Sequence, residues 1–194
     1  MRKFILILFI LLLNACGEPE MPSPYHAQDV SWQHAQADFQ LTDFNGKPRS
    51  LLDFRGKVVV LFFGYTHCPE VCPTALADLA QVMRLLGKDA DRVQVLFVTL
   101  DPERDSPKVL ANFVPSFDPS FLGLYGDEQA TKQAANAFGV NFVKQDDKHG
   151  GYTLDHTAGM YLLGTRGKPL LLAPYGQRAE HLAQDIRLLL AIGR

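Results

Sequence analysis

Residues 58–76 read VVVLFFGYTHCPEVCPTAL and place two cysteines directly after a strongly apolar segment. The run of valine, leucine and phenylalanine does not alternate with polar residues, which is typical of a strand buried on both faces. Apolar residues at helical spacing follow over residues 74–87, and Gly87 is a suitable helix stop. Cys68 and Cys72 are therefore predicted to lie between a central strand and a helix.

The start of a helix is a place that favours reactive thiols. Unpaired backbone N–H groups and the positive end of the helix dipole stabilise a thiolate, so we expect lowered thiol pKa values for this pair. A thiolate can attack a disulfide, reduce a peroxide or bind a soft metal ion. The position of the cysteines alone leaves these three kinds of chemistry open.

The spacing of the pair narrows the choice. Three residues separate Cys68 from Cys72, whereas redox catalysts of the thioredoxin type usually have two. Helix positions four apart share one face, at about 5–6 Å between Cβ atoms, so both sulfurs can reach one ion. A small adjustment would also allow a disulfide. An inert structural disulfide is less favoured, because such bridges stabilise most when they close long loops.

Two thiolates alone make an incomplete metal site, and an imidazole is a common third ligand for Cu(I). His67 precedes Cys68 and is expected to point elsewhere, while His149 and His181 have positions typical of solvated side chains. His156 stands in LDHTAGMYLL, just before an expected strand. A lone histidine beside a strand is more often structural than a ligand, so the pattern makes His156 a candidate and no more.

The rest of the chain alternates between strands and helices. The expected strands are residues 58–65, 93–100, 121–126, 140–145, 158–164 and 170–175. The expected helices are residues 74–87, 106–114, 127–139 and 178–193, and a polar, glycine-rich loop is expected over residues 146–156. This order predicts an α/β fold with a central mixed sheet flanked by helices. The turn Asn45-Gly46 within residues 39–57 predicts a β-hairpin extension at the N-terminal side.

The first residues have the features of an export signal. Arg2 and Lys3 precede FILILFILLL (4–13), an apolar run that is too short for a full membrane span. The tetrapeptide at 13–16, Leu-Asn-Ala-Cys, resembles a bacterial lipobox, in which the cysteine is lipidated. An uncleaved signal anchor is the alternative interpretation.

These features predict three segments. We expect a lipoprotein-type signal peptide over residues 1–15, a flexible tether from the lipidated Cys16 to residue 37, and a folded domain over residues 38–194. The protein would then be a membrane-anchored lipoprotein of the bacterial envelope that faces the periplasm. An oxidising compartment of this kind allows a disulfide between Cys68 and Cys72. The net charge of −2 and the absence of a basic block give no reason to expect nucleic-acid binding.

Three motifs resemble those of the Sco/SenC family, in the family's order and spacing. They are GYTHCPEVCPTAL (64–76), TLDPERDSPKVL (99–110) and DHTAGMYLL (155–163). Members of this family are membrane-tethered, thioredoxin-like, copper-binding assembly factors for cytochrome c oxidase. The resemblance extends over about residues 38–194 and implies a thioredoxin-like fold and a copper chaperone.

The resemblance also implies roles for individual residues. Cys68, Cys72 and His156 are the expected copper ligands, and the two cysteines can also form a redox-active disulfide. Asp101 is expected to support the site without binding the metal, and Asp155 to orient the imidazole of His156. The expected cargo is Cu(I), Cu(II) or both. The expected partners are the copper-bearing subunit of the oxidase, or another copper chaperone, and the membrane through the N-terminal lipid.

Two activities without a metal remain as alternatives, beside an inert domain with a disulfide. A periplasmic thiol-disulfide oxidoreductase would use Cys68 as the attacking thiolate, because Cys68 precedes the helix and is expected to be the more exposed. A thiol peroxidase would need one activated cysteine, usually with a more distant resolving partner. His156 separates these alternatives from a copper site, since thiol-disulfide exchange does not require it.

Overall fold

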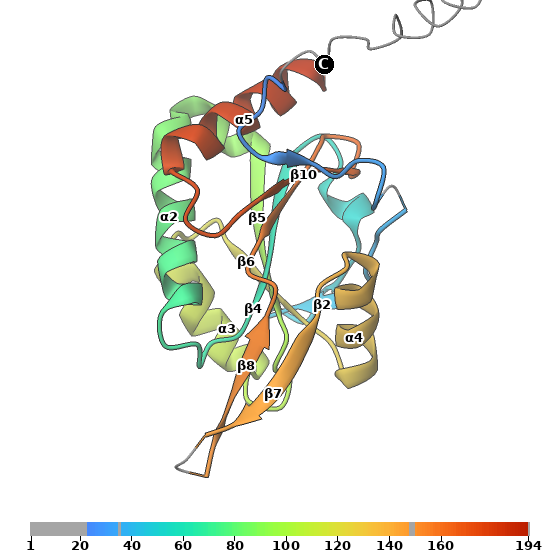
Figure 1. The fold of residues 1–194 in the computed structure, drawn as a ribbon, viewed down its shortest axis with the longest axis vertical. Coiled ribbons are helices and arrows are strands. Elements are labelled where there is room, and N and C mark those ends of the chain that lie inside the picture. Colours follow the sequence, from blue (N-terminus) through green and yellow to red (C-terminus); the bar gives the residue numbers. More distant parts are fainter. Residues whose placement is uncertain (1–22, 35, 148–149, 194) are drawn as a thin grey trace, which may run out of the picture.

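A computed structural model describes residues 23–34, 36–147 and 150–193, which form an eight-stranded sheet, flanking helices and a separate two-stranded sheet (Figure 1). The expected signal peptide (1–15) and the lipidated Cys16 lie outside the described residues, so both stay predictions. None of the helices in the described part of the chain has the length and apolar character that a membrane span requires.

The strands and helices follow the order expected of an α/β fold. The strands are β1 (Gln28–Asp29), β2 (Leu41–Asp43), β3 (Pro48–Arg49), β4 (Val58–Gly64), β5 (Val93–Thr99), β6 (Leu122–Tyr125), β7 (Phe142–Asp146), β8 (Tyr152–His156), β9 (Met160–Leu163) and β10 (Pro169–Ala173). The α-helices are α2 (Val71–Leu86), α3 (Pro107–Phe113), α4 (Glu128–Ala137) and α5 (Ala179–Ile192), and the 3₁₀ turns are η2 (Leu51–Phe54), η3 (Gly87–Arg92) and η4 (Val114–Ser116).

The main sheet is mixed, with the strand order β1-β10-β9-β4-β5-β6-β2-β3. Strand β4 runs parallel to β5 and antiparallel to β9, and β5 runs parallel to β6. Helices α2, α3 and α5 cover one face of this sheet, and α4 covers the other (Figure 1). The predicted mixed sheet with flanking helices is therefore confirmed.

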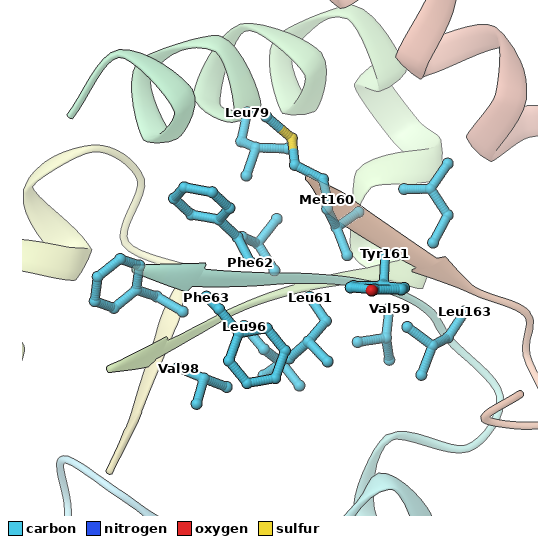
Figure 2. Close-up of a cluster of buried hydrophobic side chains, with 14 of the residues drawn as sticks. Val59, Leu61, Phe62, Phe63, Leu79, Leu96, Val98, Met160, Tyr161 and Leu163 are labelled. Atoms are coloured by element: carbon cyan, nitrogen blue, oxygen red, sulfur yellow. The ribbon is translucent and has the colours of Figure 1, made fainter. Parts of the chain in front are cut away.

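The core is centred on β4, all of whose residues are buried. Figure 2 shows Phe62 and Met160 on the side of β4 that faces Leu79 of α2, while Leu61 and Val98 lie on the opposite side. Because both faces are covered, every position of this strand favours an apolar residue, which explains the absence of alternation in the sequence.

The predicted hairpin at Asn45-Gly46 is present and joins the main sheet. Strands β2 and β3 pair on either side of this turn, and Gly46 adopts a φ of 82°, which favours glycine. Strand β2 also pairs with β6, so the hairpin extends the sheet at one edge.

The expected tether to residue 37 is not free over its described part. Strand β1 pairs with β10, with Gln28 opposite Leu172, and the Val30 backbone N–H donates to the Leu170 carbonyl at 2.9 Å. The backbone N–H groups of His26 and Ala27 both donate to the carboxylate of Asp185 on α5, each at 2.9 Å. The packed domain therefore starts near residue 25, and the predicted boundary at 38 is wrong.

The expected polar loop over residues 146–156 is also wrong in its second half. Residues 152–156 form strand β8, which pairs antiparallel with β7 from Phe142 opposite His156 to Asp146 opposite Tyr152. The two strands form a ribbon that projects from the body of the molecule (Figure 1). His156 is thus placed by a strand, not by the end of a loop.

Replacing Asp185 with alanine tests how the N-terminal segment is attached. The substitution leaves the N–H groups of His26 and Ala27 without their acceptor, so the free energy of unfolding should fall by about 1–3 kcal/mol. Urea denaturation measures this change. Glu180→Ala, at an exposed position of the same helix, should change the stability by less than about 0.5 kcal/mol. Equal stability of wild type and the Asp185 variant would contradict the attachment.

Candidate metal centre

The candidate centre lies where the chain leaves two parallel strands. Gly64 at the end of β4 is paired with Thr99 at the end of β5, so the loops that follow both strands emerge at the same edge of the sheet. The first loop contains Cys68, and the second contains Asp101. Crevices at the carboxyl ends of parallel strands are frequent binding sites in α/β proteins.

The Cys72 thiol is buried in the first turn of α2 and packs on the end of β4. The residue has 0% of its surface exposed. A Cβ atom added at Gly64 would come within 2.8 Å of the Cys72 Sγ and 2.9 Å of the Phe97 ring, so glycine is what leaves room for the sulfur. Strand β4 and helix α2 therefore fix this thiol between them.

Burial decides the protonation of Cys72. It raises the pKa of the thiol well above the usual range, and a hydrogen bond from the Tyr65 backbone opposes this rise only in part. The predicted lowering of the pKa by the helix start is therefore wrong for Cys72. The physical reason is that the side chain lies under the helix in an apolar environment, where desolvation outweighs the helix dipole.

The Cys68 thiol lies outside helix α2 and is partly exposed, so the expected difference in exposure is confirmed. The Cys72 backbone N–H donates to the Cys68 Sγ at 3.4 Å, and both thiols are free. Because Cys68 precedes the helix, the pair does not share a helix face as the spacing suggested. A turn, not a helix, brings Cys68 towards Cys72.

The imidazole of His156 faces the buried thiol from the end of β8. Its Nε2 lies 3.9 Å from the Cys72 Sγ, although 84 residues separate them in the sequence. Its Nδ1 lies 3.0 Å from the Thr157 carbonyl oxygen, which can only accept, so Nδ1 bears the proton and the Nε2 lone pair points at the sulfur. The pKa of this histidine lies below its ordinary value because of burial, and the Thr157 hydrogen bond and the Asp155 charge offset this lowering only in part.

Asp155 does not have the expected role. The His156 Nδ1–H donates to the Thr157 carbonyl oxygen, and this bond orients the imidazole. Asp155 acts only through its negative charge, which partly offsets the lowering of the His156 pKa. The side chain of Asp155 is exposed because successive residues of a strand point to opposite faces.

The donor set fits a soft metal ion. Two thiol sulfurs and one neutral imidazole nitrogen are ligands that select Cu(I), and two of the three atoms already face each other at 3.9 Å. The three donor atoms are not all within 4.8 Å of one another, so a side-chain shift is needed to complete the site. An open groove of about 550 Å³ gives access to it. The groove is lined by Tyr65, Cys68, Pro69, Glu70, Val71, Thr153, Leu154, Asp155, His156 and Ala158.

Comparison with known proteins gives a consistent family assignment. The family model described as SCO1/SenC matches residues 28–191. The chain belongs to this family. A mouse relative, "Protein SCO2 homolog, mitochondrial", is 40% identical over 157 residues, which cover 78% of this chain and 61% of the mouse protein. The chain thus matches less than two thirds of the length of that relative.

Solved structures of Sco proteins have the same fold as this chain. The structure of Bradyrhizobium japonicum ScoI with copper bound is 41% identical, with a TM-score of 0.73 and coverage of 79% of this chain and 98% of that one. The solution structure of apo Sco1 from Thermus thermophilus is also 41% identical, with a TM-score of 0.72 and coverage of 79% and 90%. The predicted thioredoxin-like fold of the Sco/SenC family is confirmed.

Asp101 lies in a cluster of polar side chains on the loops that follow β4 and β5. Donor atoms of His67, Asp101 and Asp105 lie within 4.8 Å of one another. Both carboxylates are buried. The two oxygens of Asp105 accept hydrogen bonds from the Thr66 backbone N–H and from the hydroxyl groups of Thr66 and Thr99, at 2.5–2.9 Å. These bonds join the cysteine loop to the loop after β5. His67 is exposed and directed at Asp105, which agrees with the expectation that it points away from Cys72.

The sequence motifs gave no individual role to four residues that shape this site, although Arg104 and Asp105 belong to the DPERD element (101–105) that was expected to support it. Gly64 leaves space for the Cys72 sulfur, and Asp105 ties the two loops together. Tyr65 packs edge-on against His156, with 6.1 Å between ring centroids, and Arg104 contacts the strand that ends at His156. All four lie within or next to the motifs at 64–76 and 99–110, and that proximity was the available signal.

The two thiols should differ in reactivity. In the native, reduced protein, iodoacetamide should alkylate Cys68 at least about tenfold faster than Cys72, because Cys72 is fully buried and its thiol pKa is raised. Mass spectrometry of peptides at successive times measures both rates. Denaturation in urea should abolish the difference. Faster modification of Cys72 in the native protein would contradict the described site.

Substitution of Gly64 tests the packing of the buried sulfur. In Gly64→Ala, the new methyl group would meet the Cys72 sulfur and the Phe97 ring, so the free energy of unfolding should fall by about 1–3 kcal/mol. Urea denaturation measures this change, and alkylation of Cys72 in the same samples reports whether the thiol is displaced. A variant as stable as wild type, with Cys72 still unreactive, would show that the strand end has more room than described.

Proposed function

We propose that this chain binds copper through Cys68, Cys72 and His156, and that it delivers copper to the binuclear copper centre of cytochrome c oxidase or reduces the cysteines of that centre. The observation that supports this most directly is the 3.9 Å approach of the neutral His156 Nε2 to the buried Cys72 Sγ. The copper-bound Bradyrhizobium japonicum ScoI, at 41% identity, supports the same cargo.

Each ligand has a distinct task in this proposal. Cys72 and His156 are the inner ligands, and copper binding must displace the proton that burial keeps on the Cys72 thiol. Cys68 lines the groove and completes the ligand set. Three ligands leave Cu(I) open to a thiolate or an imidazole of the partner, so that copper can leave by ligand exchange. Oxidation of both thiols to a disulfide would remove two ligands and end copper binding.

The protein is proposed to act as a membrane-anchored lipoprotein that faces the periplasm. The basis is the sequence alone: the charged start at Arg2 and Lys3, the apolar run 4–13 and the lipobox-like Cys16. Since the packed domain starts near Tyr25, the segment from Gly17 to Pro24 would be the spacer. Eight extended residues span at most about 30 Å, so the start of the packed domain would stay within that distance of the bilayer.

The activities without metal have less support. Burial keeps the proton on Cys72 in the reduced protein, so nucleophilic attack in either activity would fall to the partly exposed Cys68. The imidazole that faces Cys72 has no required task in thiol-disulfide exchange. The arrangement of the three side chains therefore favours the copper site.

Titration of the reduced protein with Cu(I), against a competing chelator, tests the proposal. Wild type should bind one equivalent, and Cys72→Ser and His156→Ala should each bind at least about tenfold more weakly, since each lacks a ligand. His181→Ala, on α5, controls for the loss of a histidine outside the site and should bind like wild type. Wild-type affinity in His156→Ala would remove this histidine from the site. Absence of copper binding by wild type would refute the proposal as a whole.

A further inference from the structure

The ribbon of β7 and β8 presents His156 to the thiols but is not part of the main sheet (Figure 1). An isolated two-stranded hairpin is only marginally stable in water. The position of the His156 imidazole therefore depends on what attaches β8 to the body of the molecule. Nothing in the pairing of β7 with β8 provides that attachment.

The register of the ribbon shows which backbone groups of β8 are free to be attached. Asn141 pairs with Thr157, and Asp147 with Gly151, through backbone hydrogen bonds at 3.2 and 2.9 Å. Bonded and non-bonded pairs alternate in an antiparallel ladder, so Thr153 and Asp155 bond to β7. The backbone polar groups of Tyr152 and Leu154 then face away from β7, along the edge where a third strand would otherwise pair.

Side chains of the body occupy this edge. The Arg104 Nη1 donates to the Tyr152 carbonyl oxygen at 2.8 Å. The Leu154 backbone N–H faces the Tyr65 hydroxyl. Arg104 thus satisfies an outward carbonyl group of β8, Tyr65 lies beside the next outward position, and the Tyr65 ring packs against the His156 ring, with 6.1 Å between the centroids.

Arg104 is itself held in one geometry. Its Nε donates to the buried Asp101 carboxylate at 2.5 Å, and the Tyr152 hydroxyl donates to the other oxygen of that carboxylate at 2.7 Å. The guanidinium lies over the Tyr152 ring at 3.6 Å and is 5.8 Å from the Tyr65 ring. A planar group with several donors can make these contacts at once, which the ammonium of lysine cannot.

We propose that Arg104 is a positioning residue for the copper site, which fastens β8 to the loop after β5 and thereby keeps His156 facing Cys72. The proposal rests on the proposed copper function and adds a residue that does not touch the metal. It also gives Asp101 a specific task, because this carboxylate orients both Arg104 and Tyr152.

A matched control exists on the same ribbon. Lys144 forms an ion pair with Glu103 at 2.7 Å and lies 4.6 Å from the Tyr152 ring, but both charged side chains are exposed, at 47% and 62%. Exposed ion pairs stabilise little. Loss of Lys144 therefore removes a charge next to Tyr152 without removing the attachment that Arg104 provides.

Amide hydrogen exchange of the reduced, metal-free protein tests the attachment directly. In Arg104→Lys, the Leu154 amide should exchange at least about tenfold faster than in wild type, while the amides of Val60 and Leu61 in β4 stay protected. In Lys144→Gln, the Leu154 amide should exchange within about twofold of wild type. Unchanged exchange of Leu154 in Arg104→Lys would overturn the proposal, and so would an equal effect in both variants.

Copper release and a second variant complete the test. Arg104→Lys should release copper to a chelator at least about tenfold faster than wild type, with the same one-to-one stoichiometry. Tyr152→Phe keeps the ring but loses the hydrogen bond to Asp101, so its Leu154 amide should exchange at least about threefold faster than in wild type. If Arg104→Lys does not fold, this second variant tests the attachment of β8 in its place. If wild type binds no copper, the proposed function fails, while the exchange of Leu154 in metal-free protein still decides the role of Arg104.

Discussion

The burial of the Cys72 sulfur against the end of β4 is the constraint on which the site depends. Gly64 leaves room for the sulfur, because a side chain at this position would collide with the Cys72 Sγ and with the Phe97 ring of β5. A thiol in this position keeps its proton because desolvation raises its pKa. The open groove beside this thiol is lined by Cys68 and His156, so these two side chains lie between the buried sulfur and solvent on that side.

The site combines a rigid part and an attached part. Cys72 belongs to the part of α2 that packs on the fully buried strand β4, whereas His156 belongs to a two-stranded ribbon outside the main sheet. Cys68 lies between these parts on a turn. A protein that must both bind a metal and release it benefits from this division, because one ligand can be fixed while the others adjust. The contacts of Arg104 and Tyr65 with β8 set how closely the attached part is held.

The sequence is sufficient to predict the elements whose structure is determined by a local pattern of residues. The unbroken apolar run at 58–63 predicted β4, and Ser106 and Asp127 cap α3 and α4 through their side chains. The polar, glycine-rich composition of residues 146–156 hid strand β8, since that strand is stabilised by side chains from distant loops. The polar composition of residues 17–37 is typical of a tether, whereas the attachment of this segment depends on Asp185, far along the chain. The pKa of Cys72 and the partner of the His156 imidazole likewise depend on packing that no local pattern encodes.

X-ray absorption spectroscopy of the Cu(I)-loaded protein tests the central claim most directly, since it reports which atoms surround the metal. The account predicts two sulfur ligands and one imidazole nitrogen in wild type, and loss of the imidazole signal in His156→Ala with both sulfurs retained. A spectrum with sulfur ligands alone in wild type, or an imidazole signal that persists without His156, would contradict it.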